Sequence, residues 1–210
     1  MKRSYKQNCA LARATDVLGE RWSLLLVRDL LVGPRRFREL QRSLRGMGSN
    51  LLASRLRELE VAGIVERLED SESRHRYGLT DAGKALEPVL LALVRWGLAY
   101  GPDNQEGYHH QDDWDLLALK ALFHADRAGD LSVCVQFKSD EFAGWVAIHK
   151  QTIRIGLGDT DSADVAVDGT IRDLFVGPQA KRVSSARSKR TLERFVSAFA
   201  LPPRGDRGRA

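Results

Sequence analysis

Apolar side chains in the first sixty residues recur at intervals of three and four, which is the period of an amphipathic helix. Four such stretches follow one another, and glycine or proline interrupts the chain between the later ones. In the fourth, Leu52, Leu56 and Leu59 predict a buried stripe between an N-cap at Ser49 and an end at Gly63. The pattern therefore predicts four consecutive short helices.

Two β-prone runs follow these helices, at residues 64–68 and 74–79, with a polar turn between them. They predict a β-hairpin. Helices joined by short turns and closed by a two-stranded hairpin have the element order of a winged helix-turn-helix. In that fold one helix enters the major groove of DNA and the hairpin reaches the adjacent backbone or minor groove.

Polar side chains on the outer face of the fourth helix are candidates for reading DNA, because Asn, Ser and Arg can hydrogen-bond to base edges. Alternation along the second strand places two arginines on one side, where they would meet phosphate or the minor groove. The candidate DNA-binding residues are Arg35, Arg36, Ser49, Asn50, Ala53, Ser54, Arg57, Arg74 and Arg76. The alternative for the Arg/Glu-rich stretch 55–60 is a solvated helix face with internal ion pairs.

Several motifs in residues 9–101 resemble the HxlR-type family of winged helix-turn-helix transcription regulators. They are CALARATDVLGERW at 9–22, LLVGPRRFREL at 30–40, RLREL at 55–59, GIVER at 63–67 and RYGLTDAG at 76–83. The resemblance implies a dimeric DNA-binding regulator whose fourth helix enters the major groove. Where the family often has Pro-Lys and Thr-Gln, this chain has Ser49-Asn50 and Ala53-Ser54. The operator sequence therefore does not follow from the resemblance.

A heptad seam predicts dimerisation through a helix capped by Thr80, with Pro88 expected to bend or loosen it. The seam consists of Ala82, Leu86, Val89, Leu93, Trp96 and Tyr100. The alternative is that this stripe packs on its own domain.

Cys9 is the candidate redox-sensing residue, because it lies near a helix start with Lys6 and Arg13 nearby. The HxlR resemblance implies a cysteine sensor of oxidants or electrophiles at this place. The alternative is a small buried residue that packs the first helix.

The second half of the chain predicts an α+β domain with an antiparallel sheet. An amphipathic helix at 112–125 precedes four strand-like runs and two further helices. Over residues 110–200 this order is similar to sterol-carrier-protein-like domains, and the similarity implies an apolar cavity for a lipid-like or aromatic effector. Candidate pocket residues are Phe137, Trp145, Ile155, Phe175 and Phe199. Ordinary core packing is the alternative for each of them.

The chain of 210 residues carries 33 Lys+Arg and 28 Asp+Glu, a formal charge of +5, but this charge is unevenly distributed. Residues 1–100 carry a net +6, residues 101–180 a net −8 and residues 181–210 a net +7. Because the acidic middle repels DNA, we expect binding to depend on the first hundred residues. We expect a winged-helix domain at 1–101 for DNA binding and dimerisation, a linker at 102–109, a second domain at 110–200 and a disordered tail at 201–210.

Other classes of protein fit less well. Apolar runs are too short for a membrane span, no signal segment opens the chain, and two distant cysteines make neither a disulfide scaffold nor a zinc site. His109 and His110 read as a solvated linker, the neighbouring aspartates as surface charge, and no catalytic constellation, metal site or cofactor is expected.

We therefore expect a cytoplasmic, nucleoid-associated homodimer that binds double-stranded DNA and regulates transcription, with repression as the expected mode and a small hydrophobic effector. It is not expected to be an enzyme or to bind a membrane. One rival is a C-terminal domain that only enlarges the dimer. Another is a lipid carrier or enzyme that uses the winged helix for protein contacts.

Overall fold

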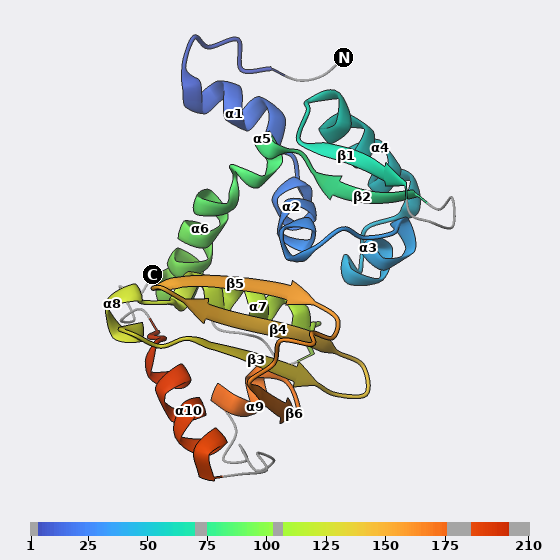
Figure 1. Ribbon diagram of the computed structural model, residues 1–210. Coiled ribbons are helices and arrows are strands. Elements are labelled where there is room, and N and C mark those ends of the chain that lie inside the picture. The colour runs from blue at the N-terminus through green and yellow to red at the C-terminus, as the bar shows by residue number, and fades with distance from the viewer. Residues whose placement is uncertain (1–3, 70–74, 103–106, 176–185, 202–210) are drawn as a thin grey trace. The chain divides into compact units, whose positions relative to one another are not determined.

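The computed structural model describes residues 4–69, 75–102, 107–175 and 186–201 (Figure 1). The chain forms two compact units, Met1–Leu90 and Leu91–Ala210. This division lies within a helix and precedes the boundary expected near residue 101. Residues 202–210, most of the expected tail, and residues 103–106 of the expected linker lie outside the described residues.

The first unit has the predicted order of four helices followed by a hairpin. Its elements are α1 (Ala10–Leu18), α2 (Ser23–Val32), α3 (Phe37–Ser43), α4 (Ser49–Val61), β1 (Val65–Glu69), β2 (His75–Leu79) and α5 (Asp81–Lys84), followed by the start of α6 (Glu87–Tyr100). The strands are antiparallel, and Val65 pairs with Leu79. The winged helix-turn-helix prediction is confirmed.

The core of this unit consists of the apolar faces of its helices, closed by Val65 and Leu79 of the hairpin. Leu52, Leu56 and Leu59 are all buried, as their helical spacing predicts. One detail of α4 differs from expectation. Gly48 is the N-cap residue and Ser49 is the first residue of the helix, so Ser49 is not its cap.

The predicted seam helix is broken into two pieces. Thr80 Oγ1 accepts a hydrogen bond from the Gly83 N–H at 3.1 Å, but the helix that it caps is the four-residue α5. The chain then turns, and α6 begins at Glu87. The expected disturbance near Pro88 is confirmed, but it interrupts the helix completely, because the Pro88 ring would clash with the carbonyl of Lys84 four residues earlier. Pro88 is tolerated where it lies, in the first turn of α6.

The second unit is a mixed α/β fold. After α7 (Asp112–Leu122) and α8 (Ala125–Ala128) come β3 (Val133–Lys138), β4 (Ala143–His149), β5 (Thr152–Leu157), β6 (Val165–Asp168), α9 (Ile171–Phe175) and α10 (Ala186–Ser197). The sheet order is β5-β4-β3-β6. The meander of β3, β4 and β5 is antiparallel as expected, but β6 pairs with β3 in parallel. The prediction of a purely antiparallel sheet is thus wrong, because a crossover returns the chain beside β3.

Candidate nucleic-acid interface

Helix α4 has one face buried in the core and one face directed outward. Leu52, Leu56 and Leu59 hold the inner face, while Ser49 and Asn50 are exposed at its start. Ala53 and Ser54 are half-buried, and Ser54 Oγ donates a hydrogen bond to Glu58 Oε1 at 3.1 Å. Of these candidate readers, the two at the start of α4 are the more accessible.

The two arginines of α4 differ sharply in their surroundings. Arg55 is buried and forms ion pairs with Glu58 on its own helix and with Glu20, 3.2 Å away, before α2. Arg57 is exposed and makes no hydrogen bond or ion pair within the described ranges. The solvated-stripe interpretation therefore fails for Arg55, which ties α4 to the start of α2. Arg57 remains available to a ligand.

A buried polar cluster connects the elements that carry α4. Asp29, fully buried in α2, accepts a hydrogen bond from Ser43 Oγ of α3 at 2.5 Å and another from Arg28 Nε at 2.8 Å. Arg35 Nε donates to the backbone oxygen of Asp29 at 3.1 Å. Because Ser43 and Arg35 lie outside α2, their bonds to Asp29 hold α2, α3 and the loop between them in one arrangement.

Arg35 does not belong to the outer surface. Only 8% of it is exposed, and its backbone exchanges two hydrogen bonds with Tyr77 of β2. The loop before α3 is thus joined to the hairpin by a single antiparallel β-bridge. Assignment of the Arg35 side chain to DNA is corrected by this burial. A Gly-Pro-Arg-Arg turn does not reveal from sequence which arginine turns inward.

The other predicted arginines have mixed positions. Arg36 and Arg76 are half-buried, and the Arg36 N–H donates to Glu39 Oε2 at 2.6 Å at the start of α3. Arg74 lies outside the described residues. Of the two hairpin arginines predicted to bind DNA, Arg76 is therefore the one whose position the structure describes.

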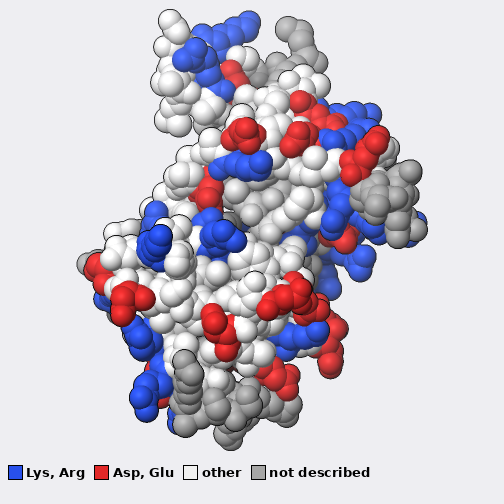
Figure 2. Space-filling view, in the orientation of Figure 1, with Lys and Arg blue, Asp and Glu red and all other residues white. Residues whose placement is uncertain are grey.

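Three exposed arginines on and after α3 escaped the sequence prediction. Arg38 and Arg42 lie one turn apart on α3, and Arg45 follows it. Figure 2 shows Lys and Arg side chains, with some acidic ones among them, on the side where Figure 1 places α3 and the tips of β1 and β2. In helix-turn-helix proteins the helix before the recognition helix crosses the DNA backbone. The sequence did contain a signal for these arginines. The helical spacing of Phe37, Leu40 and Leu44 predicts the buried face of the helix and so places the arginines on its exposed face.

Cys9 is exposed at the N-cap position of α1. The backbone N–H groups of Ala12 and Leu11 lower the pKa of its thiol. The alternative of a buried packing residue is therefore wrong for Cys9. It describes Cys134 instead, which is buried and whose thiol pKa is raised by that burial.

The apolar seam is exposed along α6. Val89, Leu93, Trp96 and Tyr100 all face outward, and 60% of the Trp96 surface is accessible. The Trp96 and Tyr100 rings are 6.2 Å apart between centroids. Ala82 lies on α5 and Leu86 in the turn before α6, so neither continues the seam as a heptad. Leu90, beside the seam, is the residue of this helix that packs into the first unit.

The predicted pocket residues divide between the two faces of the sheet. Strand pairing puts Phe137 and Ile155 on one face and Trp145 on the other, where its ring covers Gly156. Phe195 links Phe137, 6.3 Å away between centroids, to Phe199, 5.0 Å away. Phe199 also contacts Phe175 and Phe123. Trp145 therefore lies on the opposite face from Phe137 and Ile155, and Phe123 and Phe195 join the aromatic cluster of Phe137, Phe175 and Phe199.

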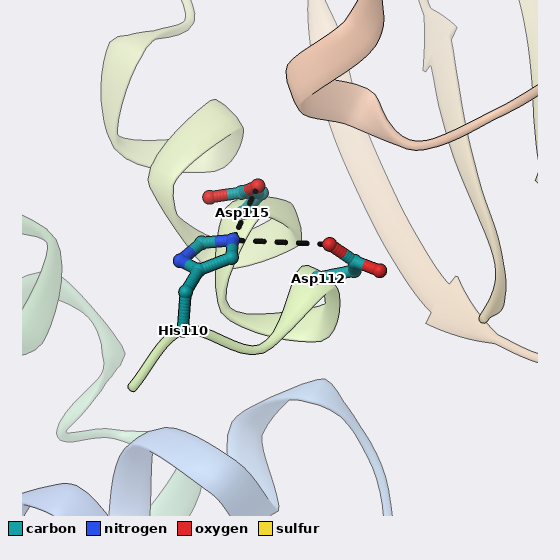
Figure 3. A group of neighbouring side chains, drawn as sticks. All are labelled: His110, Asp112 and Asp115. Atoms are coloured by element: carbon teal, nitrogen blue, oxygen red, sulfur yellow. Dashed lines mark hydrogen bonds and ion pairs between the residues drawn. The ribbon is translucent and has the colours of Figure 1, made fainter. Parts of the chain in front are cut away.

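The acidic start of α7 is more structured than its sequence suggested. His110 is half-buried, and its Nε2 lies 3.1 Å from Asp115 Oδ2 (Figure 3). The neighbouring Asp113 is buried. The expectation of a solvated histidine without partners is wrong, because α7 begins at Asp112 and its first turn carries Asp115 back to His110.

Among the helices that the structure describes, none has the length and apolar character of a membrane span.

Comparison with known proteins matches the first unit and α6. The HxlR-like helix-turn-helix family matches residues 17–105. The HTH-type transcriptional regulator YvaP of Bacillus subtilis is 41% identical over 86 residues, which are 40% of this chain and 80% of that protein. The HTH-type transcriptional regulator Rv3095 of Mycobacterium tuberculosis is 41% identical over 95 residues, 44% of this chain and 60% of the relative. The redox regulator HypR in its reduced form is 33% identical over 42% of this chain and 90% of its own, with a TM-score of 0.40.

Proposed function

The chain belongs to the HxlR-like helix-turn-helix family of transcriptional regulators, and we propose that it binds operator DNA as a cytoplasmic homodimer and represses transcription there. The observation that carries this proposal is the outer face of α4. Leu52, Leu56 and Leu59 are buried, while Ser49, Asn50 and Arg57 are exposed on the helix that would enter the major groove in this fold.

Each part of the interface has a distinct task. The Asn50 amide can form two hydrogen bonds to adenine, and the Arg57 guanidinium can do the same to guanine. Positive charge for contacts with phosphates would come from Arg38, Arg42, Arg45 and the hairpin residue Arg76. Such contacts position the protein without selecting a sequence.

The exposed α6 stripe supports the proposed dimer. Burial of Val89, Leu93, Trp96 and Tyr100 against a second copy would remove a row of large apolar side chains from water. A symmetric dimer would present two copies of α4 to half-sites about one DNA turn, ~34 Å, apart.

Cys9 is the proposed input of a redox or electrophile signal. Its exposure and lowered thiol pKa favour the reactive thiolate. Modification would change operator affinity only if it favours one dimer arrangement over another. Alkylated protein with unaltered operator affinity would contradict this role.

For the second unit we propose a sterol-carrier-like domain that binds a small apolar effector beside the cluster of Phe123, Phe137, Phe175, Phe195 and Phe199. The aromatic contacts within that cluster support an apolar site. A purely structural module is the alternative, and the complete burial of Phe137 and Phe195 favours it. Fluorescent fatty-acid titration distinguishes the two, because a filled core leaves no saturable binding.

The experiment for the whole proposal is selection of genomic DNA fragments by the purified protein, followed by anisotropy titration at several salt concentrations. We expect a protected, roughly two-fold symmetric site, and an affinity whose logarithm falls steeply with the logarithm of salt concentration, by about 0.9 per phosphate contact. Absence of salt-dependent DNA binding would favour the rival role of the winged helix in protein contacts.

A further inference from the structure

Three ligating side chains converge at the start of α7 in the second unit. His110 precedes α7, and Asp112 and Asp115 occupy its first turn on one side of the helix. His110 Nε2 lies 3.1 Å from Asp115 Oδ2 and 3.9 Å from Asp112 Oδ1 (Figure 3). All three ligating atoms lie within 4.8 Å of one another, and each side chain is half-buried. The spacing His-x-Asp-x-x-Asp thus gathers one nitrogen and two oxygen ligands.

These separations match the space around one metal ion. Zinc binds imidazole nitrogen and carboxylate oxygen at about 2.0–2.2 Å, so neighbouring ligand atoms of a tetrahedral ion are roughly 3.4 Å apart. The two measured separations from His110 Nε2 lie on either side of that value. Small side-chain rotations would bring the three atoms to equal distances from an ion.

The charges around the cluster favour a cation. Asp112 and Asp115 face His110, the neighbouring Asp113 adds a third carboxylate, and α9 contributes Asp173 together with Arg172. Carboxylates therefore outnumber the positive groups. A divalent ion would supply the missing positive charge.

The imidazole is also held in position by packing. The Trp114 ring meets His110 edge-on with centroids 6.1 Å apart, and it meets His109 in the same manner at 5.4 Å. Because these contacts restrict the His110 ring, its Nε2 is directed to the carboxylates before any ligand arrives (Figure 3).

We propose that His110, Asp112 and Asp115 form a binding site for a divalent first-row transition-metal ion such as Zn²⁺. The imidazole ligand favours zinc and its neighbours over Mg²⁺ and Ca²⁺, which prefer oxygen ligands alone. Three protein ligands leave a coordination position for water. The ion would join the segment that carries His110 to the first turn of α7 and so stabilise the second unit.

The test is isothermal titration calorimetry of the full chain with ZnCl₂, after removal of any affinity tag and of bound metals by chelation. The Cys9→Ser background is used so that the exposed thiol cannot contribute heat. The test variants are His110→Gln and Asp115→Asn, and the matched control is His149→Gln. The control removes an exposed histidine of β4 whose ring nitrogen contacts Ser132 Oγ. Melting curves without metal report whether each variant folds.

We expect one Zn²⁺ per chain in the background protein and the control, at least about tenfold weaker binding in both test variants, and little competition by Mg²⁺. We also expect Zn²⁺ to shift the His110 ring resonances in NMR spectra, which keeps the test decisive if a variant unfolds. Absence of saturable Zn²⁺ binding, or equal binding by all variants, would overturn the proposal. The three residues would then only form ion pairs at the start of α7. The outcome does not depend on DNA binding.

Discussion

Arg35 and Tyr77 exchange two backbone hydrogen bonds, of 2.9 and 2.7 Å, across the gap between the α3 loop and the wing. The pair joins the hairpin to the segment that carries α3, and the Arg35 side chain continues inward to the backbone of Asp29. Arg35 therefore holds the β1–β2 hairpin and the helix-turn-helix in one arrangement, although its sequence context predicted a DNA contact.

The first prediction compares Arg35→Ala with Arg38→Ala. Loss of the buried Arg35 hydrogen bond and packing should lower the free energy of unfolding by about 1–3 kcal/mol. Arg38 is exposed, so its loss should leave stability nearly unchanged but reduce the salt dependence of DNA binding by about one phosphate contact. Urea unfolding and anisotropy titration measure the two effects, and the reverse pattern would contradict the assigned positions.

The second prediction concerns the two arginines of α4. Arg55→Ala removes the ion pairs to Glu58 and Glu20 together with a buried stem, and should destabilise the fold by about 1–2 kcal/mol after allowance for the partly exposed glutamates. Arg57→Ala should unfold at the same urea concentration as the parent and yet bind DNA more weakly. If both variants behave alike in both assays, α4 does not have the orientation described.

The third prediction concerns the apolar stripe of α6. Trp96→Glu should give a monomer in sedimentation velocity at micromolar concentration, because it places a charge in the proposed dimer contact. Val61→Glu is the matched control. Val61 is 91% exposed at the end of α4 and is not part of the stripe, so this substitution should leave the dimer intact. A parent protein that is already monomeric would contradict the proposed dimer.

The fourth prediction separates the two cysteines by their reactivity. Iodoacetamide should modify Cys9 much faster than Cys134 in the folded protein, because Cys9 is exposed and its thiol pKa is lowered while that of Cys134 is raised. The rate at Cys9 should rise with pH through a midpoint below that of an ordinary thiol. Mass spectrometry of Cys9→Ser and Cys134→Ser assigns the rates, and equal reactivity would contradict the environment described.

Elements set by short-range rules could be predicted from the sequence. The helical spacing of Leu52, Leu56 and Leu59 predicts the helix. The two β-prone runs with a polar turn between them predict the hairpin. The parallel pairing of β6 with β3 could not be read in this way, because no local signal states which strand a crossover returns to.

Side-chain direction was the harder part of the candidate site. Arg35 and Arg36 are neighbours in sequence, yet the backbone pairing of Arg35 with Tyr77 is what turns one of them inward. His110 likewise finds its carboxylates only because α7 begins at Asp112. Both outcomes depend on where an element starts, which is the least certain part of a sequence pattern.

The proposed reading of DNA sequence by the outer face of α4 is tested by the substitution Asn50→Ala. Asn50 is exposed and outside the core, so the substitution should leave the fold unchanged. Anisotropy titrations at one salt concentration should give about tenfold weaker binding to the selected operator, with affinity for a random duplex unchanged within about twofold. Equal losses on both duplexes, or no loss on the operator, would contradict the claim.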